Sequence, residues 1–212
     1  MPVHKSNAAE VRLAGRLLPH PPHVCAFFHS KDEEFRALGS FISDGLKRGE
    51  KAFHIVDKRT RSDHVSRLGQ LGIDVPGSES SGQLEVCAWE DAYLRDGYFD
   101  QQRQLKLIEE VLEGGRTQGF PLTRLVANME WALEDRAGVA DIVEYESRLN
   151  YILPKYADPV ICTYDLSRFG ADVVMDIMRT HPLVIVGGVL QENPFYVPPD
   201  QFLSELAARK KH

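Results

Sequence analysis

VICTYDLSRF, at residues 160–169, is the stretch of sequence that decides the fold. Its first half is apolar and rich in β-forming residues, and this run stops at Tyr164 and Asp165. A helical segment follows, and a second apolar run, LVIVGG at residues 183–188, begins after His181 and Pro182. Two apolar strands joined by a helix predict parallel strands of a covered sheet. Polar residues beside these strands would then lie at one edge of the sheet, which predicts a ligand-binding site.

The same alternation of strand and helix extends along the rest of the chain. We expect further strands at residues 23–30, 52–57, 84–89 and 123–133, and helices at 31–50, 60–72, 100–116, 139–153, 170–180 and 199–210. This order predicts an α/β fold of three layers, with a mostly parallel sheet and helices on both faces. LVIVGG and the adjoining VLQENPFYV (189–197) predict an antiparallel C-terminal hairpin at the sheet edge.

The N-terminus differs in composition from the rest of the chain. Residues 1–20 are polar, and PHPPH at residues 19–23 is unsuited to a regular helix or strand. We therefore predict a flexible segment at residues 1–20 and one domain at residues 21–212. The length of 212 residues and a hydrophobic content of 43% suffice for one large core without disulfides or metals.

Charge and cysteine usage exclude several classes of protein. Lys and Arg number 25 against 31 Asp and Glu, for a net charge of -6, so we expect no direct contact with nucleic acid. The cysteines Cys25, Cys87 and Cys162 lie far apart in apolar runs without metal-ligand spacing, which predicts buried reduced thiols and no metal site. We expect no signal peptide, because the N-terminal residues carry charges and no continuous apolar run, and the longest apolar run, LVIVGGVL, is too short to span a bilayer. We expect a cytoplasmic protein without membrane contact.

Polar residues follow the predicted strands at their carboxyl ends, where ligands of open parallel sheets usually bind. His29 lies near the end of the first strand, and Glu130 and Trp131 lie near the end of the fourth. Tyr164 and Asp165 end the fifth strand, and Arg168 follows it. We expect these residues to converge. Glu130 could bind a ligand or pair with Arg124, and either reading is open. Tyr145 and Glu146 lie on a predicted helix that is either a plain surface or one wall of the pocket.

Two enzyme classes can be weighed against this binding site. LVANME (125–130) reads like the Walker B strand of a RecA-type NTPase. A phosphate-binding loop needs GxxxxGK[ST], whereas the first strand is followed by FFHSKDEEF, which has no glycine and three carboxylates. Phosphate is therefore disfavoured there, and we expect no P-loop. No GxSxG motif or triad spacing is present, and Cys162 and His181 are weak catalytic candidates, so we expect no enzyme.

The order of motifs resembles the MEDS domain, a sensory domain of methanogens and methylotrophs. HVCAFFHSKDE, GLKRGE, LVANMEWAL, YESRLN, CTYDLSRF, HPLVIVGG and NPFYVPP occur in that order, and the resemblance spans about residues 20–206. It implies a RecA/KaiC-like fold without a working P-loop, and a module that senses hydrocarbon derivatives. The positions that match the family's motifs are His23, Glu130, Trp131, Tyr145, Glu146, Cys162, Tyr164, Asp165, His181, Pro182, Asn193 and Pro194.

The leading hypothesis is a stand-alone sensory domain that binds a small organic molecule at the carboxyl edge of its sheet. Because no kinase or helix-turn-helix segment is evident, we expect the signal to pass through self-association or a regulatory protein such as a kinase or transcription regulator. No cofactor is expected. The alternative is a degenerate RecA-like nucleotide-binding protein or NTPase that keeps Glu130 as its acidic strand end.

Overall fold

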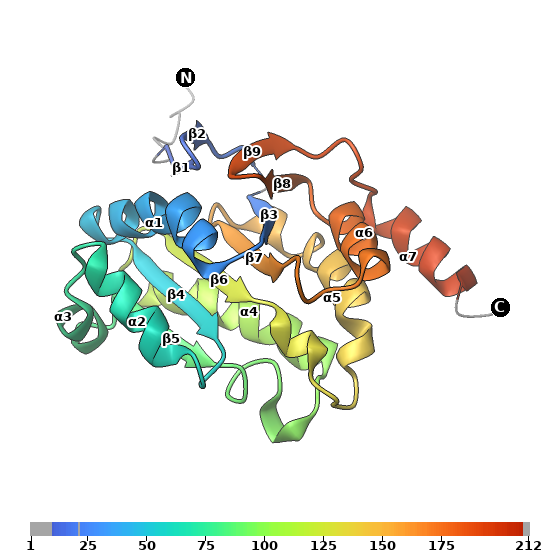
Figure 1. The fold of residues 1–212 in the computed structure, drawn as a ribbon, viewed down its shortest axis with the longest axis horizontal. Coiled ribbons are helices and arrows are strands. Elements are labelled where there is room, and N and C mark those ends of the chain that lie inside the picture. Colours follow the sequence, from blue (N-terminus) through green and yellow to red (C-terminus); the bar gives the residue numbers. More distant parts are fainter. Residues whose placement is uncertain (1–9, 21, 210–212) are drawn as a thin grey trace, which may run out of the picture.

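A seven-stranded sheet forms the centre of the molecule, in a computed structural model that describes residues 10–20 and 22–209 (Figure 1). The strand order is β5-β4-β6-β7-β3-β8-β9, in which β8 and β9 pair antiparallel and the other neighbours pair parallel. This confirms the predicted α/β fold with an antiparallel edge. The strands are β3 (His23–Phe28), β4 (Lys51–Val56), β5 (Leu84–Ala88), β6 (Thr123–Asn128), β7 (Val160–Asp165), β8 (Leu183–Val186) and β9 (Val189–Glu192).

Helices cover both faces of the sheet, as expected from strands that are buried on both sides. Helices α1 (Lys31–Lys47), α2 (Arg61–Gln70) and α3 (Val75–Ser80) lie on one face. Helices α4 (Gln101–Thr117), α5 (Ile142–Leu149) and α6 (Ala171–Thr180) lie on the other, and α7 (Pro199–Arg209) contacts α5 and α6 (Figure 1).

Alternate residues of one strand supply the two cores. Val24 and Ala26 of β3 belong to the core under α1 and α2, whereas Cys25 and Phe27 belong to the core under α4, α5 and α6. Successive side chains of a strand point to opposite faces. His23 therefore faces α5 together with Cys25 and Phe27, which decides where the functional groups meet.

The N-terminal residues that the structure describes differ from the predicted flexible segment. Strands β1 (Arg12–Leu13) and β2 (Arg16–Leu17) form a small antiparallel hairpin that contacts α1, and Leu13 is buried. Both turn residues, Ala14 and Gly15, have positive φ, as a two-residue hairpin loop requires. The hairpin was missed because alanine is unusual at such a position. Residues 1–9 of the predicted flexible segment lie outside the described residues.

Three segments differ from the structure predicted for them. Strand β6 ends at Asn128, and Glu130–Leu133 form one turn of 3-10 helix that carries Trp131 into the core. Val75–Ser80, for which no element was predicted, form helix α3, whose first turn is capped by the carboxylate of Asp74. Helix α5 ends at Leu149 because the Asn150 side chain donates to the carbonyl groups of Glu146 and Ser147.

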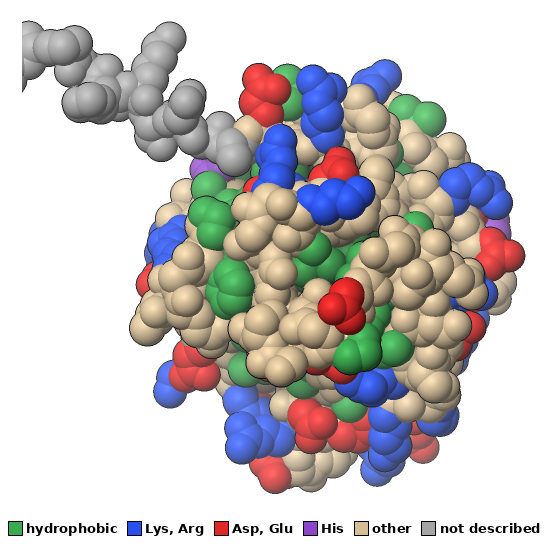
Figure 2. All heavy atoms as spheres, turned by 90° about the vertical axis from the view of Figure 1, so that its left-hand side faces the viewer, with side chains coloured by type: hydrophobic (Ala, Val, Ile, Leu, Met, Phe, Trp, Pro, Cys, Tyr) green, Lys and Arg blue, Asp and Glu red, His purple; other side chains and the backbone are tan. Residues whose placement is uncertain are grey.

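Among the described residues, none of the helices has the length and apolar character needed to cross a bilayer. One side of the molecule, with α3 and the β5 edge nearest the viewer, is shown as spheres in Figure 2. Acidic and basic side chains are interspersed on this face rather than separated by sign. Such a surface differs from the one-sided basic footprint of a nucleic-acid-binding face.

Candidate functional site

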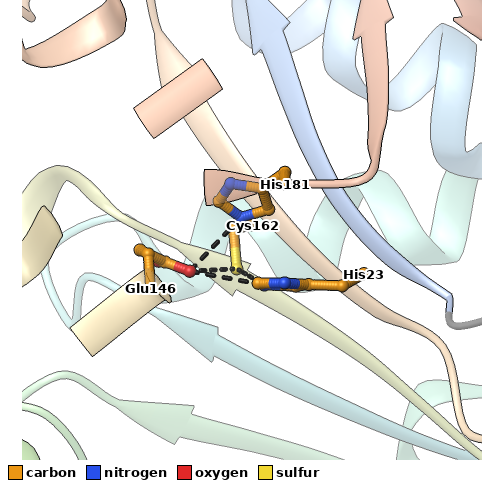
Figure 3. A group of neighbouring side chains, drawn as sticks. All are labelled: His23, Glu146, Cys162 and His181. Carbon is orange, nitrogen blue, oxygen red and sulfur yellow. Dashed lines mark hydrogen bonds and ion pairs between the residues drawn. The ribbon is translucent and has the colours of Figure 1, made fainter. Parts of the chain in front are cut away.

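Four side chains that could bind a ligand or an ion meet in the buried layer between the sheet and α5 (Figure 3). His23 begins β3, Cys162 lies within β7, His181 lies between α6 and β8, and Glu146 projects from α5. Each is at most 1% exposed. We call this group the buried cluster. Its members come from β3, β7, α5 and the connection between α6 and β8.

The carboxylate of Glu146 lies at the centre of the buried cluster. Its Oε2 atom is 3.3 Å from His23 Nε2 and 3.2 Å from His181 Nε2. The Cys162 sulfur lies 3.7 Å from the same Oε2 atom and 3.9 Å from His23 Nε2. The other oxygen, Oε1, accepts a hydrogen bond of 2.9 Å from the hydroxyl of Tyr164. Tyr164 thereby fixes the plane of the carboxylate.

Neighbouring groups fix the orientation of both imidazole rings. His181 Nδ1 lies 2.9 Å from the main-chain oxygen of Ile177, which can only accept, so we assign a proton to Nδ1. The Asn150 amide nitrogen donates to Thr180 O at 2.7 Å, so its oxygen faces His23 Nδ1 at 3.1 Å. His23 Nδ1 must therefore donate as well. When the rings are neutral, both Nε2 atoms present a lone pair to the buried cluster.

The protonation of the buried cluster follows from its burial and its close pairs. Burial opposes ionisation of Glu146, but His181 and then His23 stabilise the carboxylate and lower its pKa to about 2. Burial, then repulsion from His181, lowers the pKa of His23 despite the nearby carboxylate. Burial and the charge of Glu146 raise the pKa of the Cys162 thiol well above its usual value. Burial thus favours the neutral form of His23, whereas the two imidazoles favour the carboxylate form of Glu146.

The predicted site residues separate into three groups. His23, Glu146, Cys162, Tyr164 and His181 meet in and beside the buried cluster. Asn193 holds the main chain of His181 in place, because its amide donates to the main-chain oxygen of His181 at 2.7 Å. The residues predicted to converge at the carboxyl edge therefore do not all meet there, because Tyr164 lies beside the buried cluster. His23 and His181 precede or begin their strands, so the strand direction places them away from that edge.

Trp131 and Tyr145 form an aromatic group with Tyr93 and Phe99 in the same core. The Trp131 ring stacks on Tyr93 with centroids 4.6 Å apart and lies 4.4 Å from Phe99. Trp131 and Tyr145 are both 0% exposed. Their contacts are those of core side chains, and the structure gives them a packing role. The open question for Tyr145 and Glu146 is thus answered in part, since α5 turns both side chains inward.

Glu130, Asp165, His29 and Arg168 lie at the carboxyl edge. Glu130 is buried, and its Oε1 atom accepts the main-chain N–H of Asp165 at 3.0 Å, which ties the ends of β6 and β7 together. Burial raises the pKa of Glu130. Arg124 binds Glu50 at 2.5 Å, so the predicted alternative of a Glu130–Arg124 pair is wrong. His29 and Arg168 are exposed.

The loop between β3 and α1 is closed by the helix's own side chains. The N-cap hydroxyl of Ser30 accepts the Glu33 N–H, and the Glu33 carboxylate accepts the His29 N–H at 2.8 Å. A helix N-terminus attracts anions through such N–H groups. Here the carboxylate of Glu33 already occupies part of that position. A depression of about 330 Å³ lies farther along the edge, beyond β4 and β5, where Lys58, Arg59, Trp89 and Glu90 line it.

A second pair of buried histidines predicts a pH dependence of stability. His54 Nδ1 lies 2.9 Å from His64 Nε2. Burial, then the charges of Lys31, Arg61 and Arg67, lower the pKa of His64 to about 4. Because the unfolded chain binds this proton near pH 6.5, we expect the free energy of unfolding to fall by roughly 3 kcal/mol as pH falls from 6.5 to 4. Urea unfolding at several pH values measures the slope. An equal slope in a His64→Gln variant would contradict the assignment.

The sequence of the chain matches a known protein family. Residues 22–182 match the family described as MEDS, the methanogen/methylotroph, DcmR sensory domain. The chain belongs to the MEDS family. A curated MEDS relative is the transcriptional repressor DcmR of Methylorubrum extorquens, which is 25% identical over 177 residues. That alignment covers 82% of this chain and 63% of the repressor, so the chain spans less than two thirds of the repressor's length.

Solved structures relate this MEDS chain to KaiC-like proteins. The KaiC-like protein PH0186 of Pyrococcus horikoshii OT3 has a TM-score of 0.54 and 19% identity, with coverage of 81% of this chain and 73% of PH0186. The flagellar accessory protein FlaH of Methanocaldococcus jannaschii has a TM-score of 0.51 and 13% identity, covering 89% and 82%. At these identities the likeness concerns the fold alone. It confirms the predicted RecA/KaiC-like architecture.

Proposed function

We propose that this MEDS chain binds a small organic molecule and passes the signal to a regulatory protein, such as a kinase or a transcription regulator. Membership in a sensory family and the relation to a transcriptional repressor support a sensory and regulatory role. The observation that carries the proposal is the buried cluster. Its side chains link β3, β7, α5 and the connection between α6 and β8. A change of its chemical state would therefore affect all four of these segments.

The cost of such a cluster favours a function over a purely structural role. A buried carboxylate and buried imidazoles lose hydration, and apolar side chains of similar volume would often stabilise a core equally well. The role proposed for the cluster is binding and not catalysis. In support, burial and the charge of Glu146 raise the pKa of the Cys162 thiol well above its usual value, which disfavours the thiolate that a nucleophile needs.

Two features argue against nucleotide as the sensed molecule. The phosphate-binding position after β3 carries Asp32, Glu33 and Glu34 in the first turn of α1. The N–H groups of His29 and Glu33 already have partners in Glu33 and Ser30. An added phosphate would have to displace these bonds and approach like charges. Because the fold resembles that of KaiC-like proteins, a degenerate nucleotide-binding protein is the alternative that an experiment must test.

A thermal-shift experiment separates the two proposals. Short alcohols, methylated amines and halogenated alkanes would be compared with Mg²⁺-ATP on the full chain. A ligand at a hundred times its dissociation constant stabilises by about 2.7 kcal/mol, which raises the melting temperature by several degrees. We expect at least one organic compound to do so. Stabilisation by Mg²⁺-ATP alone would favour the rival.

A pair of tyrosine variants then localises the binding. Tyr164→Phe removes only the hydroxyl that donates to Glu146 and should reduce the shift caused by the organic compound. Tyr156→Phe is the matched control, because Tyr156 is also buried but lies outside the buried cluster. An equal shift in both variants would place the ligand elsewhere.

A further inference from the structure

We propose that His23, Glu146, Cys162 and His181 bind one divalent transition-metal ion of the zinc class. The inference deepens the proposed function and rests on it for the biological role of the ion, whereas binding itself can be measured independently. The sequence led us to expect no metal site, since the spacing is not that of a metal motif. The structure brings the four donor atoms within 4.8 Å of one another.

The distances between donor atoms suit tetrahedral coordination. With metal–nitrogen and metal–oxygen bonds near 2.0 Å, the edges of a tetrahedron are about 3.3 Å, and an edge that includes sulfur is about 3.6 Å. Glu146 Oε2 lies 3.3 and 3.2 Å from the two Nε2 atoms. The Cys162 sulfur lies 3.7 Å from that oxygen and 3.9 Å from His23 Nε2. These four edges match a tetrahedron closely. The two remaining edges, from His181 Nε2 to His23 Nε2 and to the Cys162 sulfur, are within 4.8 Å, so the His181 ring would move inward to complete the site.

The groups around the four donors are those that orient metal ligands. A histidine that binds a metal usually donates its other N–H to a carbonyl or carboxylate, which fixes the ring. His23 donates to the Asn150 side-chain oxygen, and His181 donates to the Ile177 main-chain oxygen. Tyr164 donates to the Glu146 oxygen that faces away from the cluster centre. Each donor atom is thereby left with a free lone pair directed inward.

No distribution of protons gives both Nε2 atoms and the Glu146 carboxylate a favourable partner. His181 Nε2 has no directed hydrogen bond within the described part of the chain, although it lies at ion-pair distance from Glu146. A proton on both Nε2 atoms would bury a net charge of +1 in the cluster. A proton on one ring leaves the other lone pair facing the carboxylate. Neither state is favourable in a dry core.

A divalent ion would accept the inward lone pairs and neutralise the negative charge of the cluster. Binding would release the thiol proton of Cys162, as metals do with coordinated thiols. The two positive charges of the ion then balance the thiolate and the carboxylate, and the imidazoles stay neutral. Two imidazoles, one thiolate and one carboxylate are donors that zinc accepts, and four of them complete its usual coordination.

Metal content of the full chain tests the proposal directly. The protein would be purified without chelator, stripped, and titrated with Zn²⁺ or Co²⁺. We expect about one ion per chain, and for Co²⁺ the absorption of a tetrahedral site with a thiolate charge-transfer band. Removal of zinc should lower the melting temperature by on the order of 10 °C, and its return should restore it. A chain that takes up neither ion overturns the proposal.

Three variants separate ligands from neighbours. Cys162→Ser should abolish the charge-transfer band. It should also weaken metal binding more than Asn150→Ala does, because Asn150 only orients a ligand. Asn150→Ala, which removes the partner of His23 Nδ1, should weaken binding by about 10- to 100-fold. Cys25→Ala is the matched control: this buried thiol is the register partner of Cys162 on the next strand but donates to Leu183 O, so metal affinity should be unchanged.

The outcomes distinguish this inference from the proposed function. Retention of full affinity in Cys162→Ser and in His181→Ala would overturn the metal site. Should Cys162→Ser fail to fold, the charge-transfer band of the wild-type chain decides whether the thiolate is a ligand. Stabilisation of the metal-free chain by an organic compound, without uptake of zinc or cobalt, would support the proposed function and reject the metal. Metal binding without any response to organic compounds would support the metal site and reject the proposed binding of an organic molecule.

Discussion

Replacement of Glu146 by alanine is expected to lower the free energy of unfolding by about 3 to 5 kcal/mol. The carboxylate is fully buried and is the common neighbour of both imidazoles, the Cys162 thiol and the Tyr164 hydroxyl. Its loss leaves a void and a buried hydroxyl without an acceptor. Urea unfolding followed by circular dichroism measures the change.

Glu144→Ala is the control for this prediction, because Glu144 lies on the same helix. Its carboxylate contacts Arg148 at 2.9 Å, four residues along α5. A partly exposed pair of this kind contributes about 0.3 to 0.5 kcal/mol. If both alanine variants lost the same stability, the buried cluster would have no special energetic role.

Trp131→Ala should be similarly destabilising, by about 3 to 5 kcal/mol. The indole is fully buried, stacks on Tyr93 and contacts Phe99, so the deletion removes the contacts with both of these rings. Chemical unfolding measured by near-ultraviolet circular dichroism reports the loss of this aromatic group. The result would assign Trp131 to the core, whereas the sequence pattern made it a candidate ligand contact.

Leu133→Ala provides the comparison within the same 3-10 turn. Leu133 is 39% exposed, so truncation should cost far less than for the buried indole. A Trp131→Ala chain with nearly unchanged stability but weaker binding of an organic ligand would reverse the assignment. Trp131 would then be a ligand contact after all.

Most of the fold could be predicted because apolar periodicity is a local property. The strand at Val160–Asp165 and the helix at Ala171–Thr180 lie within a residue or so of their predicted bounds. The boundary at Glu130 was missed because VANMEWAL contains no glycine or proline that would mark the end of a strand. The 3-10 turn arises from tertiary packing, in which the Trp131 ring enters the core.

The sequence predicted which residues belong to the candidate site better than it predicted where they lie. The motif positions included His23, Glu146, Cys162, Tyr164 and His181, all of which meet. Their placement at the carboxyl edge was wrong, since the rule used for open sheets considers strand ends and not residues that begin a strand. No local spacing links His23 to His181, and only the parallel pairing of β3 with β7 and β8 brings them together.

The distance along the chain between the partners of the buried cluster has a consequence for folding. His23 and Cys162 are 139 residues apart in sequence, and His181 is farther still. Such high contact order slows the search for native pairing, and the N-terminal half emerges from the ribosome well before its partners. Fragments that end before His181 should therefore lack the buried cluster. The cluster can form only once nearly the whole chain has folded.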